Sequence, residues 1–375
     1  MDKTKIAILF GGLSPEHNTS LAGGFSIIID INIDKYDIFP IYVKQNGDFS
    51  TYNESVNSLY DFLNDKKNHI YLDPETSIDK YKEKLALILK DNKLKSESML
   101  ENLFNKEFDI VFPIFHGKNG EDGSIQGLLD FLDIAYVGCG ITGSAICIDK
   151  EITKKICEAN NIPVVEYLVY KKYQWEEEKE KLLTTIENKI DYPLFVKPVS
   201  LGSSIGITKA KNRDELINGL QVGFDYDSKV LIEKGLKVEE YSVSVIGNDR
   251  PIASEIALFR SLNPDFFDFE SKYSEKALSS IIPAPIDDIL TKEIKTTAIN
   301  IYKFLELNGF ARIDFFIENR VLYLNEVNTI PGLDIYGTFI KQWKKSGIDK
   351  TKLIDMLIDF GFEKFNEKQR LKNCY

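Results

Sequence analysis

The sequence has few of the features that mark a secreted, membrane-bound or nucleic-acid-binding protein. Its four cysteines, Cys139, Cys147, Cys157 and Cys374, have neither the density of a disulfide framework nor the spacing of a metal motif. The apolar run at 6–10 is too short for the core of a signal peptide or for a membrane span. No cluster of lysine and arginine stands out, and the net charge of −11 argues against a large nucleic-acid footprint. We therefore expect a soluble cytoplasmic protein with reduced cysteines and no membrane or nucleic-acid partner.

The chain is long enough for two or three domains. Of its 375 residues, 43% are hydrophobic, which supports ordinary packed cores. Strand-like and helix-like segments alternate from residue 5 onward, a pattern typical of an α/β fold. We predict an N-terminal domain with a parallel sheet over 1–149, a central domain over 150–240 and a C-terminal domain over 241–375.

Two features of the first unit carry no predicted chemistry. Residues 45–106 are polar and charge-rich, with one helical patch near 81–89, and we expect a surface excursion there. His17 stands next to a glycine turn and is expected to be a surface residue.

The segment 312–332 carries the clearest chemical signal, because two apolar runs joined by a polar turn predict a hairpin. Alternate residues of a strand share a face, so Arg312 and Asp314 point the same way, as do Glu326 and Asn328. Carboxylates within otherwise apolar strands are costly unless they are paired. Two carboxylates and a carboxamide beside a guanidinium indicate a Mg2+ site completed by substrate phosphates. The alternative is an exposed hairpin with ordinary surface charges.

A second signal is the Gly-Ser loop at 202–206, which follows a strand. Backbone N–H groups of such a loop bind phosphate oxygens, but the sequence matches neither the P-loop nor the Rossmann fingerprint. A loop of this kind is by itself more often a simple turn. Lys197 precedes it and Lys150 opens the central unit, which supplies two ammonium groups for a polyphosphate. A nucleotide bound with a metal ion accounts for both signals.

Five segments resemble the D-alanine:D-alanine ligase family of the ATP-grasp superfamily. They occur in the family's order and span nearly the whole chain, at 10–21, 116–123, 197–206, 267–273 and 312–332. The long first unit is similar to that of the longer members, which include ligases of vancomycin resistance. The resemblance implies a three-domain ATP-grasp fold. It also implies ATP-dependent ligation of two D-amino acids, D-Ala with D-Ala or a related one, into a dipeptide for peptidoglycan precursors.

The chemistry that the resemblance implies has two steps. The carboxylate of the first amino acid attacks the γ-phosphate of ATP, and the amine of the second then displaces phosphate from the acyl phosphate. Asp314, Glu326 and Asn328 would hold two Mg2+ ions, or Mn2+ in their place, with Glu326 bridging them. Arg312 and the backbone N–H of Gly332 would form the oxyanion site.

The residues implied for ATP lie in the second and third units. The phosphates would be held by Lys150, Lys197, Lys272, Ser203 and Ser204. The nucleoside would be held by Glu233, Lys234, Leu236 and Glu240. Val238 departs from the pattern, since the family usually has Gly there.

The residues implied for the first amino acid come from the first unit. Glu16 would fix its amino group, and with Ser203 and Tyr273 it resembles a hydrogen-bonded bridge of the family. His116 and Glu121 would form the wall of the pocket, although His116 is also compatible with simple loop packing. Tyr273 resembles the members that make amides rather than esters.

The acceptor segment departs from the family. The family usually has a Ser five residues after Gly332, where this chain has Gly337, and Asp334 is an additional acid. Thr338 would supply the hydroxyl after a one-residue shift, and Lys272 matches the other partner of the acceptor carboxylate. The pocket for the first amino acid departs as well, because Thr19 stands where many members have an apolar residue near the methyl of D-Ala.

These departures leave three interpretations open. The acceptor is D-Ala, or it is D-Ser or a polar or cationic amino acid in contact with Asp334, or the chain is a nucleotide-binding regulator with a decayed acceptor site. The resemblance further implies a homodimer.

Overall fold

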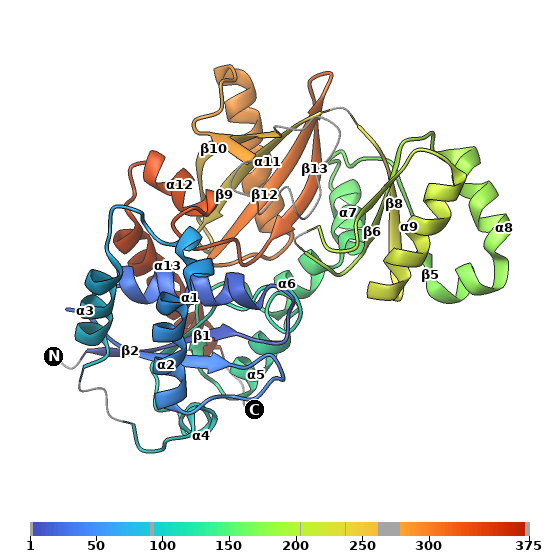
Figure 1. Cartoon of the computed structure of the whole chain (residues 1–375). Helices are drawn as coiled ribbons and strands as arrows, with labels where there is room; N and C mark the ends of the chain where they lie inside the picture. The colour runs from blue at the N-terminus through green and yellow to red at the C-terminus, as the bar shows by residue number, and fades with distance from the viewer. Residues whose placement is uncertain (1–2, 91–93, 203, 237, 262–277, 372–375) are drawn as a thin grey trace.

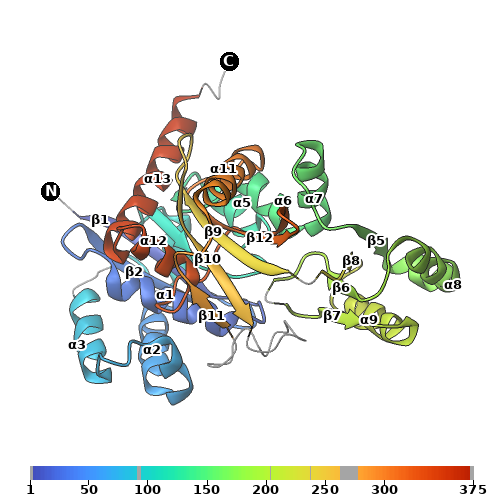
Figure 2. The same cartoon turned by 90° about the horizontal axis from the view of Figure 1, so that it is seen from above.

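The computed structural model describes residues 3–90, 94–202, 204–236, 238–261 and 278–371. Its framework is three β-sheets flanked by helices (Figure 1). The second sheet, with α8 and α9, extends away from the other two, as the view from above also shows (Figure 2). The first two sheets fall within the first two predicted units, whereas the third sheet begins at Glu239, just before the predicted third unit; the boundaries at 149/150 and 240/241 stay predictions. Within the described ranges, no helix is long and apolar enough to cross a membrane.

The first sheet has the order β2–β1–β3–β4, and its strands are parallel, as predicted. Its strands are β1 (Thr4–Gly11), β2 (Tyr36–Val43), β3 (Ile110–Pro113) and β4 (Ala135–Tyr136). Ile6, Ile8 and Phe10 of β1 face one core, while Ala7 and Leu9 face another. Burial on both faces explains why this strand is apolar throughout. The helices α1 (His17–Asp30), α5 (Ser124–Phe131) and α6 (Ile141–Ile148) belong to this unit.

The segment 45–106 is a helical layer over the first core rather than a plain surface excursion. It contains α2 (Tyr52–Asn64), the 3-10 helix η1 (Lys66–Tyr71), α3 (Ile78–Ile88) and α4 (Met99–Phe104). Thr51, Ser77 and Ser98 begin the three α-helices by accepting backbone N–H groups. The sequence-based prediction was wrong because apolar residues dispersed among charged ones form an apolar face only once the helices exist.

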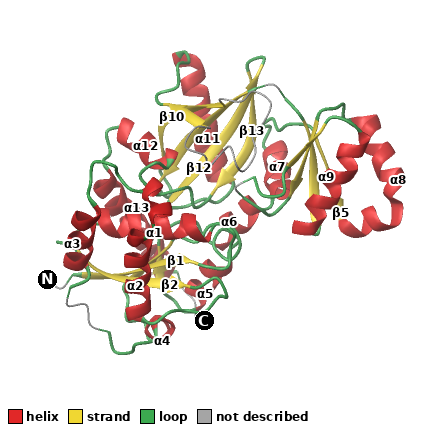
Figure 3. Ribbon diagram, viewed as in Figure 1, coloured by secondary structure: helices red, strands yellow, loops and turns green. Residues whose placement is uncertain are grey.

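The second sheet has the order β5–β8–β6–β7 and is antiparallel. Its strands are β5 (Tyr167–Lys171), β6 (Leu194–Pro198), β7 (Thr208–Ala210) and β8 (Lys229–Lys234). The predicted central unit also contains the helices α7 (Lys150–Ala159), α8 (Lys172–Lys189) and α9 (Arg213–Tyr226). Leu194, Val196 and Ile232 share one core with buried residues of α8 and α9, which lie together beside the sheet (Figure 3).

The third sheet is antiparallel, with the order β11–β10–β9–β12–β13. Its strands are β9 (Glu239–Ile246), β10 (Ile252–Ser261), β11 (Leu278–Ile281), β12 (Phe310–Glu318) and β13 (Val321–Asn328). The helix α11 (Asp288–Phe304) packs on it through Ile294, Ala298 and Ile301. The chain then forms α12 (Thr338–Lys345) and α13 (Lys350–Arg370).

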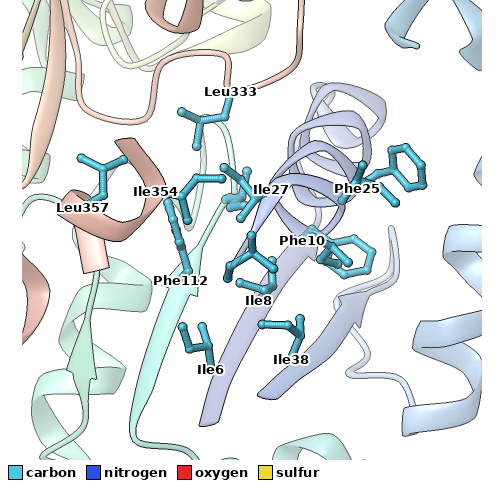
Figure 4. Close-up of a cluster of buried hydrophobic side chains, with 14 of the residues drawn as sticks. Ile6, Ile8, Phe10, Phe25, Ile27, Ile38, Phe112, Leu333, Ile354 and Leu357 are labelled. Carbon is cyan, nitrogen blue, oxygen red and sulfur yellow. The ribbon is translucent and has the colours of Figure 1, made fainter. Parts of the chain in front are cut away.

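The C-terminal helix joins the last part of the chain to the first sheet. Ile354 and Leu357 of α13 and Leu333 from the preceding loop lie in the same core as Ile27 and Phe112 (Figure 4). At the start of α13, the Lys350 Nζ donates to Asp30 Oδ2 at 2.8 Å and to the carbonyl of Ser26 at 2.9 Å. The loop after Gly332 is therefore anchored to the N-terminal unit as well as to its own sheet.

We expect Ile354→Ala to destabilise the protein by about 2–5 kcal/mol, because the side chain is 1% exposed and its removal leaves a cavity between α13 and the first sheet. Urea unfolding followed by circular dichroism measures the loss as a lower midpoint. Leu371→Ala is the control, since Leu371 is 67% exposed and its truncation removes little packing. Equal midpoints for the two variants would contradict this account of α13.

Candidate functional site

The predicted hairpin is present as β12 and β13. The strands pair from Arg312 with Asn328 to Glu318 with Val321, and Asp314 lies opposite Glu326. The turn residues Asn319 and Arg320 have φ values of 50° and 65°, the left-handed conformations that a two-residue hairpin turn requires. An irregularity between Asp314 and Phe315 leaves Asn325 as an extra residue of β13. Because the register holds up to this point, the polar side chains of both strands share one face.

The centre of this face is an ion pair between Arg312 and Asp314. Nε and Nη2 of Arg312 donate to Oδ1 and Oδ2 of Asp314 at 2.9 and 2.7 Å. Nδ2 of Asn328 donates to the same Oδ2 at 3.1 Å, and the Asp314 carboxylate is fully buried. Burial opposes the charge of Arg312, but the Asp314 carboxylate outweighs it and raises the pKa of the guanidinium above its ordinary value, with smaller contributions from Glu326 and Glu240.

This donor set fits a hard divalent cation. Asp314 and Glu326 are paired across two strands and Asn328 contacts the first carboxylate, which places oxygen donors of all three within one region. Among the described residues, no three His, Cys, Asp or Glu side chains gather as a metal site. Two protein carboxylates with an amide, completed by phosphate oxygens, are the arrangement that suits Mg2+. The metal roles of these residues stay predictions.

A buried cluster of charges lies between α7, β6 and β8. Oε1 of Glu233 accepts from Lys154 Nζ at 2.6 Å, and Oε2 accepts from Lys197 Nζ at 2.5 Å. Burial opposes ionisation of Glu233, yet the two ammonium groups lower its pKa to about 2. Lys197 was predicted from the sequence, whereas Lys154 was not. The missed signal was its position, four residues after Lys150 and hence on the same side of α7.

The Gly-Ser loop folds next to Lys150. Nζ of Lys150 donates to the carbonyl of Leu201 at 2.5 Å, and its backbone N–H donates to the carbonyl of Val199 at 3.2 Å. Ser204 and Gly206 have positive φ values of 57° and 71°, and the N–H groups of Ile205 and Ile207 donate to the carbonyls of Gly202 and Ser204 within the loop. Ser203 lies outside the described residues, as do Lys272 and Tyr273.

The residues predicted for the first amino acid surround the same loop. A methyl group built at Gly202 would lie 3.3 Å from Oε2 of Glu16, and one at Gly117 would lie 3.2 Å from that oxygen. Glu16 thus lies beside both glycine loops. Thr19, one turn further along α1, is partly buried.

Glu121 links the first unit to the segment that follows the β12–β13 hairpin. Its Oε2 accepts from the backbone of Gly117 at 2.9 Å, and its Oε1 accepts from the backbone of Ile330 at 3.0 Å. Burial raises the pKa of Glu121, and the neighbouring His116 opposes that rise. His116 is itself 5% exposed, and its Nε2 has no hydrogen-bond partner within the described part of the chain.

One narrow cleft unites these predicted residues. It is lined by Glu121, Lys150, Gly202, Glu326 and Asn328, together with neighbouring backbone. These residues come from the first unit, from the start of the central unit and its loop, and from β13. The cleft therefore brings amino-acid, phosphate and metal candidates together.

The residues predicted for the nucleoside lie at the end of β8 and the start of β9. Glu240 is 7% exposed, and its Oε1 accepts from Asn325 Nδ2 at 3.4 Å. Lys234 is exposed and Leu236 is partly buried. Both oxygens of Glu233 are paired with lysines, and its role toward the nucleoside stays a prediction.

The acceptor segment has a structural reason for its departure from the family pattern. The backbone N–H of Gly337 donates to the carbonyl of Asp334 at 3.0 Å. A Cβ atom built at Gly337 would lie only 2.2 Å from the carbonyl oxygen of Gly332, so a serine does not fit this loop. Oδ1 of Asp334 accepts from the backbone of Tyr336 at 2.8 Å and stabilises the turn. Thr338 is the first residue of α12.

The prediction for His17 was wrong. The side chain is 4% exposed, with Nδ1 2.7 Å from the carbonyl of Gly12 and Nε2 3.1 Å from Oη of Tyr42. His17 fastens the glycine turn to β2. The sequence around His17 gave no sign of this contact, because Tyr42 is distant from it in the chain.

Cys139, Cys147 and Cys157 are free and buried, as expected.

We expect Gly337→Ser to lower turnover rather than supply the family's hydroxyl, because its Cβ would displace the carbonyl of Gly332. The steady-state rate of ADP release measures this. Gly127→Ala is the control, since the added methyl meets only Ile141, at 3.9 Å. A more active Gly337→Ser variant would show that the loop readily adopts another conformation.

We expect Lys154→Met to destabilise the protein by about 3–5 kcal/mol, because it removes one partner of a buried carboxylate. It should also raise the KM for ATP, since Glu233 then pairs with Lys197 alone. Thermal unfolding and steady-state kinetics measure the two effects. Lys155→Met is the matched control, because Lys155 pairs with Glu151 at the surface of the same helix. The prediction fails if both variants behave alike.

Several proteins of known family align with nearly the whole chain. A D-alanine–D-alanine ligase from Caldicellulosiruptor bescii is 39% identical over 375 residues, which are 99% of each chain. The VanG D-Ala:D-Ser ligase from Enterococcus faecalis has a TM-score of 0.74 and 30% identity, covering 96% of this chain and 100% of that one. A D-alanine–D-alanine ligase from Bacillus anthracis complexed with ATP has a TM-score of 0.69 and 28% identity, covering 98% of this chain and 100% of that one.

Two family models divide the chain between them. The model described as D-ala D-ala ligase N-terminus matches residues 5–139, which include Glu16, His116 and Glu121. The model described as D-ala D-ala ligase C-terminus matches residues 156–359, which include the β12–β13 hairpin. The resemblance found in the sequence is therefore confirmed, and the chain belongs to the D-alanine–D-alanine ligase family of ATP-dependent, carbon–nitrogen bond-forming enzymes.

Proposed function

We propose that this protein joins two D-amino acids, with D-Ala as the first, into a dipeptide at the expense of ATP. The observation that carries the proposal is the cleft in which Glu121, Lys150, Glu326 and Asn328 meet. The reaction requires an amino-acid carboxylate and the phosphates of ATP to meet, and this cleft brings together residues predicted to bind each of them. Peptidoglycan precursors are the destination that fits a D-amino-acid dipeptide.

The proposed first step is phosphoryl transfer. A carboxylate oxygen of the first amino acid attacks the γ-phosphorus, the bond to the bridging oxygen breaks, and ADP leaves. Lys150, Lys197, Lys272 and the loop residues Ser203 and Ser204 hold the phosphates, while Glu233, Lys234, Leu236 and Glu240 form the nucleoside site. Glu16 holds the amino group of the first amino acid, and the Glu16–Ser203–Tyr273 bridge positions it.

The hairpin would hold Mg2+ through Asp314, Glu326 and Asn328. When bound, the ion neutralises charge on the transferring phosphoryl group. We propose two ions, with Mn2+ as a substitute. The Arg312–Asp314 pair holds this carboxylate in one orientation, which supports the proposal.

The proposed second step forms the amide. The free amine of the acceptor attacks the acyl carbon, and the tetrahedral intermediate then expels inorganic phosphate while the nitrogen loses a proton. Arg312 and the backbone N–H of Gly332 are the donors for the developing oxyanion, which is where pre-aimed donors contribute most. Exclusion of water protects the acyl phosphate from hydrolysis.

The domain division, oligomeric state and cellular location of the enzyme are also proposals. We propose the three-domain division at 149/150 and 240/241, a homodimer and a cytoplasmic location. The substrates are small amino acids, and neither a nucleic acid nor a membrane takes part.

The test is ADP release with D-Ala, ATP and Mg2+, with the product identified by mass spectrometry. We expect amino-acid-dependent ADP formation that a chelator abolishes. Arg312→Lys should lower kcat by about 100-fold or more, as expected for loss of an oxyanion donor. Arg320→Met, in the exposed turn of the same hairpin, should keep wild-type activity.

Circular dichroism establishes that both variants are folded. Binding of ATP without any turnover stimulated by D-amino acids would instead favour the regulator interpretation and refute the proposed ligase.

A further inference from the structure

Gln342 is a buried amide on α12, the helix that follows the acceptor loop at 333–337. Its Nε2 donates to the carbonyl of Ser242 at 2.7 Å, and its Oε1 accepts from Ser244 Oγ at 2.5 Å. Gln342, Ser242 and Ser244 are each 0% exposed. A buried amide is costly unless both of its polar ends are paired, so these two bonds hold α12 against β9.

The two serines lie on the face of the third sheet that carries the predicted site. Residues opposite each other in antiparallel strands share a face, and Ser244 pairs with Arg312. Ser242 pairs with Asp314 in the same way. The residues between them point to the other face, where α11 packs. Gln342 therefore binds the face that also carries the Arg312–Asp314 ion pair.

Apolar packing by itself leaves the position of α12 less defined than these hydrogen bonds do. The helix lies beside β9 and β10 (Figure 2), and its residues Phe339 and Trp343 belong to the first core. Hydrophobic contact has no preferred direction, whereas a hydrogen bond has a preferred angle and a specific partner. The amide of Gln342 therefore fixes both the rotation of α12 about its axis and its position along β9.

The rotation of α12 decides where its first residue points. Thr338 stands four residues before Gln342, so the two side chains lie on the same side of the helix, one turn apart. Thr338 is the residue predicted to offer a hydroxyl to the carboxylate of the acceptor. A rotation of this helix, which is only eight residues long, would turn that hydroxyl away from the face of Arg312.

We propose that Gln342 is a positioning residue, which directs the Thr338 hydroxyl toward the acceptor by fastening α12 to Ser242 and Ser244. The inference rests on the proposed ligase function and concerns the binding of its second amino acid. Gln342 acts through Thr338 and contacts neither amino acid.

The test is a double-mutant cycle, measured as the KM of each amino-acid site from ADP release over a range of D-Ala concentrations. Gln342→Met keeps the length of the side chain and removes the amide. We expect it to raise the KM of the acceptor site about fivefold to tenfold, the effect of one lost hydrogen bond to the substrate. The KM values for ATP and for the first amino acid should change by less than about twofold, because their predicted ligands lie on other elements.

Thr338→Val removes the hydroxyl that Gln342 is proposed to position. In this background, Gln342→Met should raise the KM of the acceptor site by less than about twofold, because no hydroxyl is left to misplace. An equal effect of Gln342→Met in both backgrounds would overturn the inference, as would an unchanged acceptor KM in the single variant.

Trp343→Phe is the matched control, because it loosens the packing of the same helix without removing a hydrogen bond. Trp343 is 1% exposed, and its Nε1 has no hydrogen-bond partner among the described residues. This variant should lower the melting temperature and leave the acceptor KM unchanged. An acceptor KM that rises as much as in Gln342→Met would trace the effect to general loosening of α12 and refute the role of the amide.

Circular dichroism shows whether Gln342→Met is folded. If it is not, Ser244→Ala takes its place in the cycle, because this change removes one partner of the amide and leaves the bond from Gln342 to Ser242. An absence of ADP release from the wild-type protein with every D-amino acid would refute the ligase function itself, which is a different outcome.

Discussion

The buried ion pair between Arg312 and Asp314 is the constraint on which the site depends. A carboxylate without solvent needs a partner, and a bidentate guanidinium two residues away on the same strand face is the nearest that the chain provides. This pairing fixes the polar face of β12, and the register with β13 then sets Glu326 and Asn328 beside it. The same arrangement keeps the guanidinium charged and in a defined orientation.

The β12–β13 hairpin forms only part of the site, and contacts with the first unit complete it. Glu121 bridges the glycine loop of the first unit to the backbone of Ile330. Leu333 and α13 bury apolar surface against the first sheet immediately afterwards. The short segment between these anchors contains Gly332 and the acceptor loop. Tight backbone contact there explains why Gly337 replaces a larger residue.

Glu233 is a second buried carboxylate of the site, and it too is paired with cations. Glu233 receives an ammonium group on each oxygen, so its charge is compensated without water. The arrangement also places Lys197 at a fixed position next to the loop that follows β6. Glu233 thus holds two lysines of separate elements, α7 and β6, in fixed positions.

The sequence by itself determined what strand alternation and local turn chemistry encode: the parallel first sheet, the hairpin, its metal-type donors and the family. Those signals lie within a few residues of each other, and the period of a strand decides which side chains share a face. The positions of Lys154 and the buried His17 were decided only by the tertiary structure. Their partners Glu233 and Tyr42 are distant in sequence, and packing of separate elements brings each pair together.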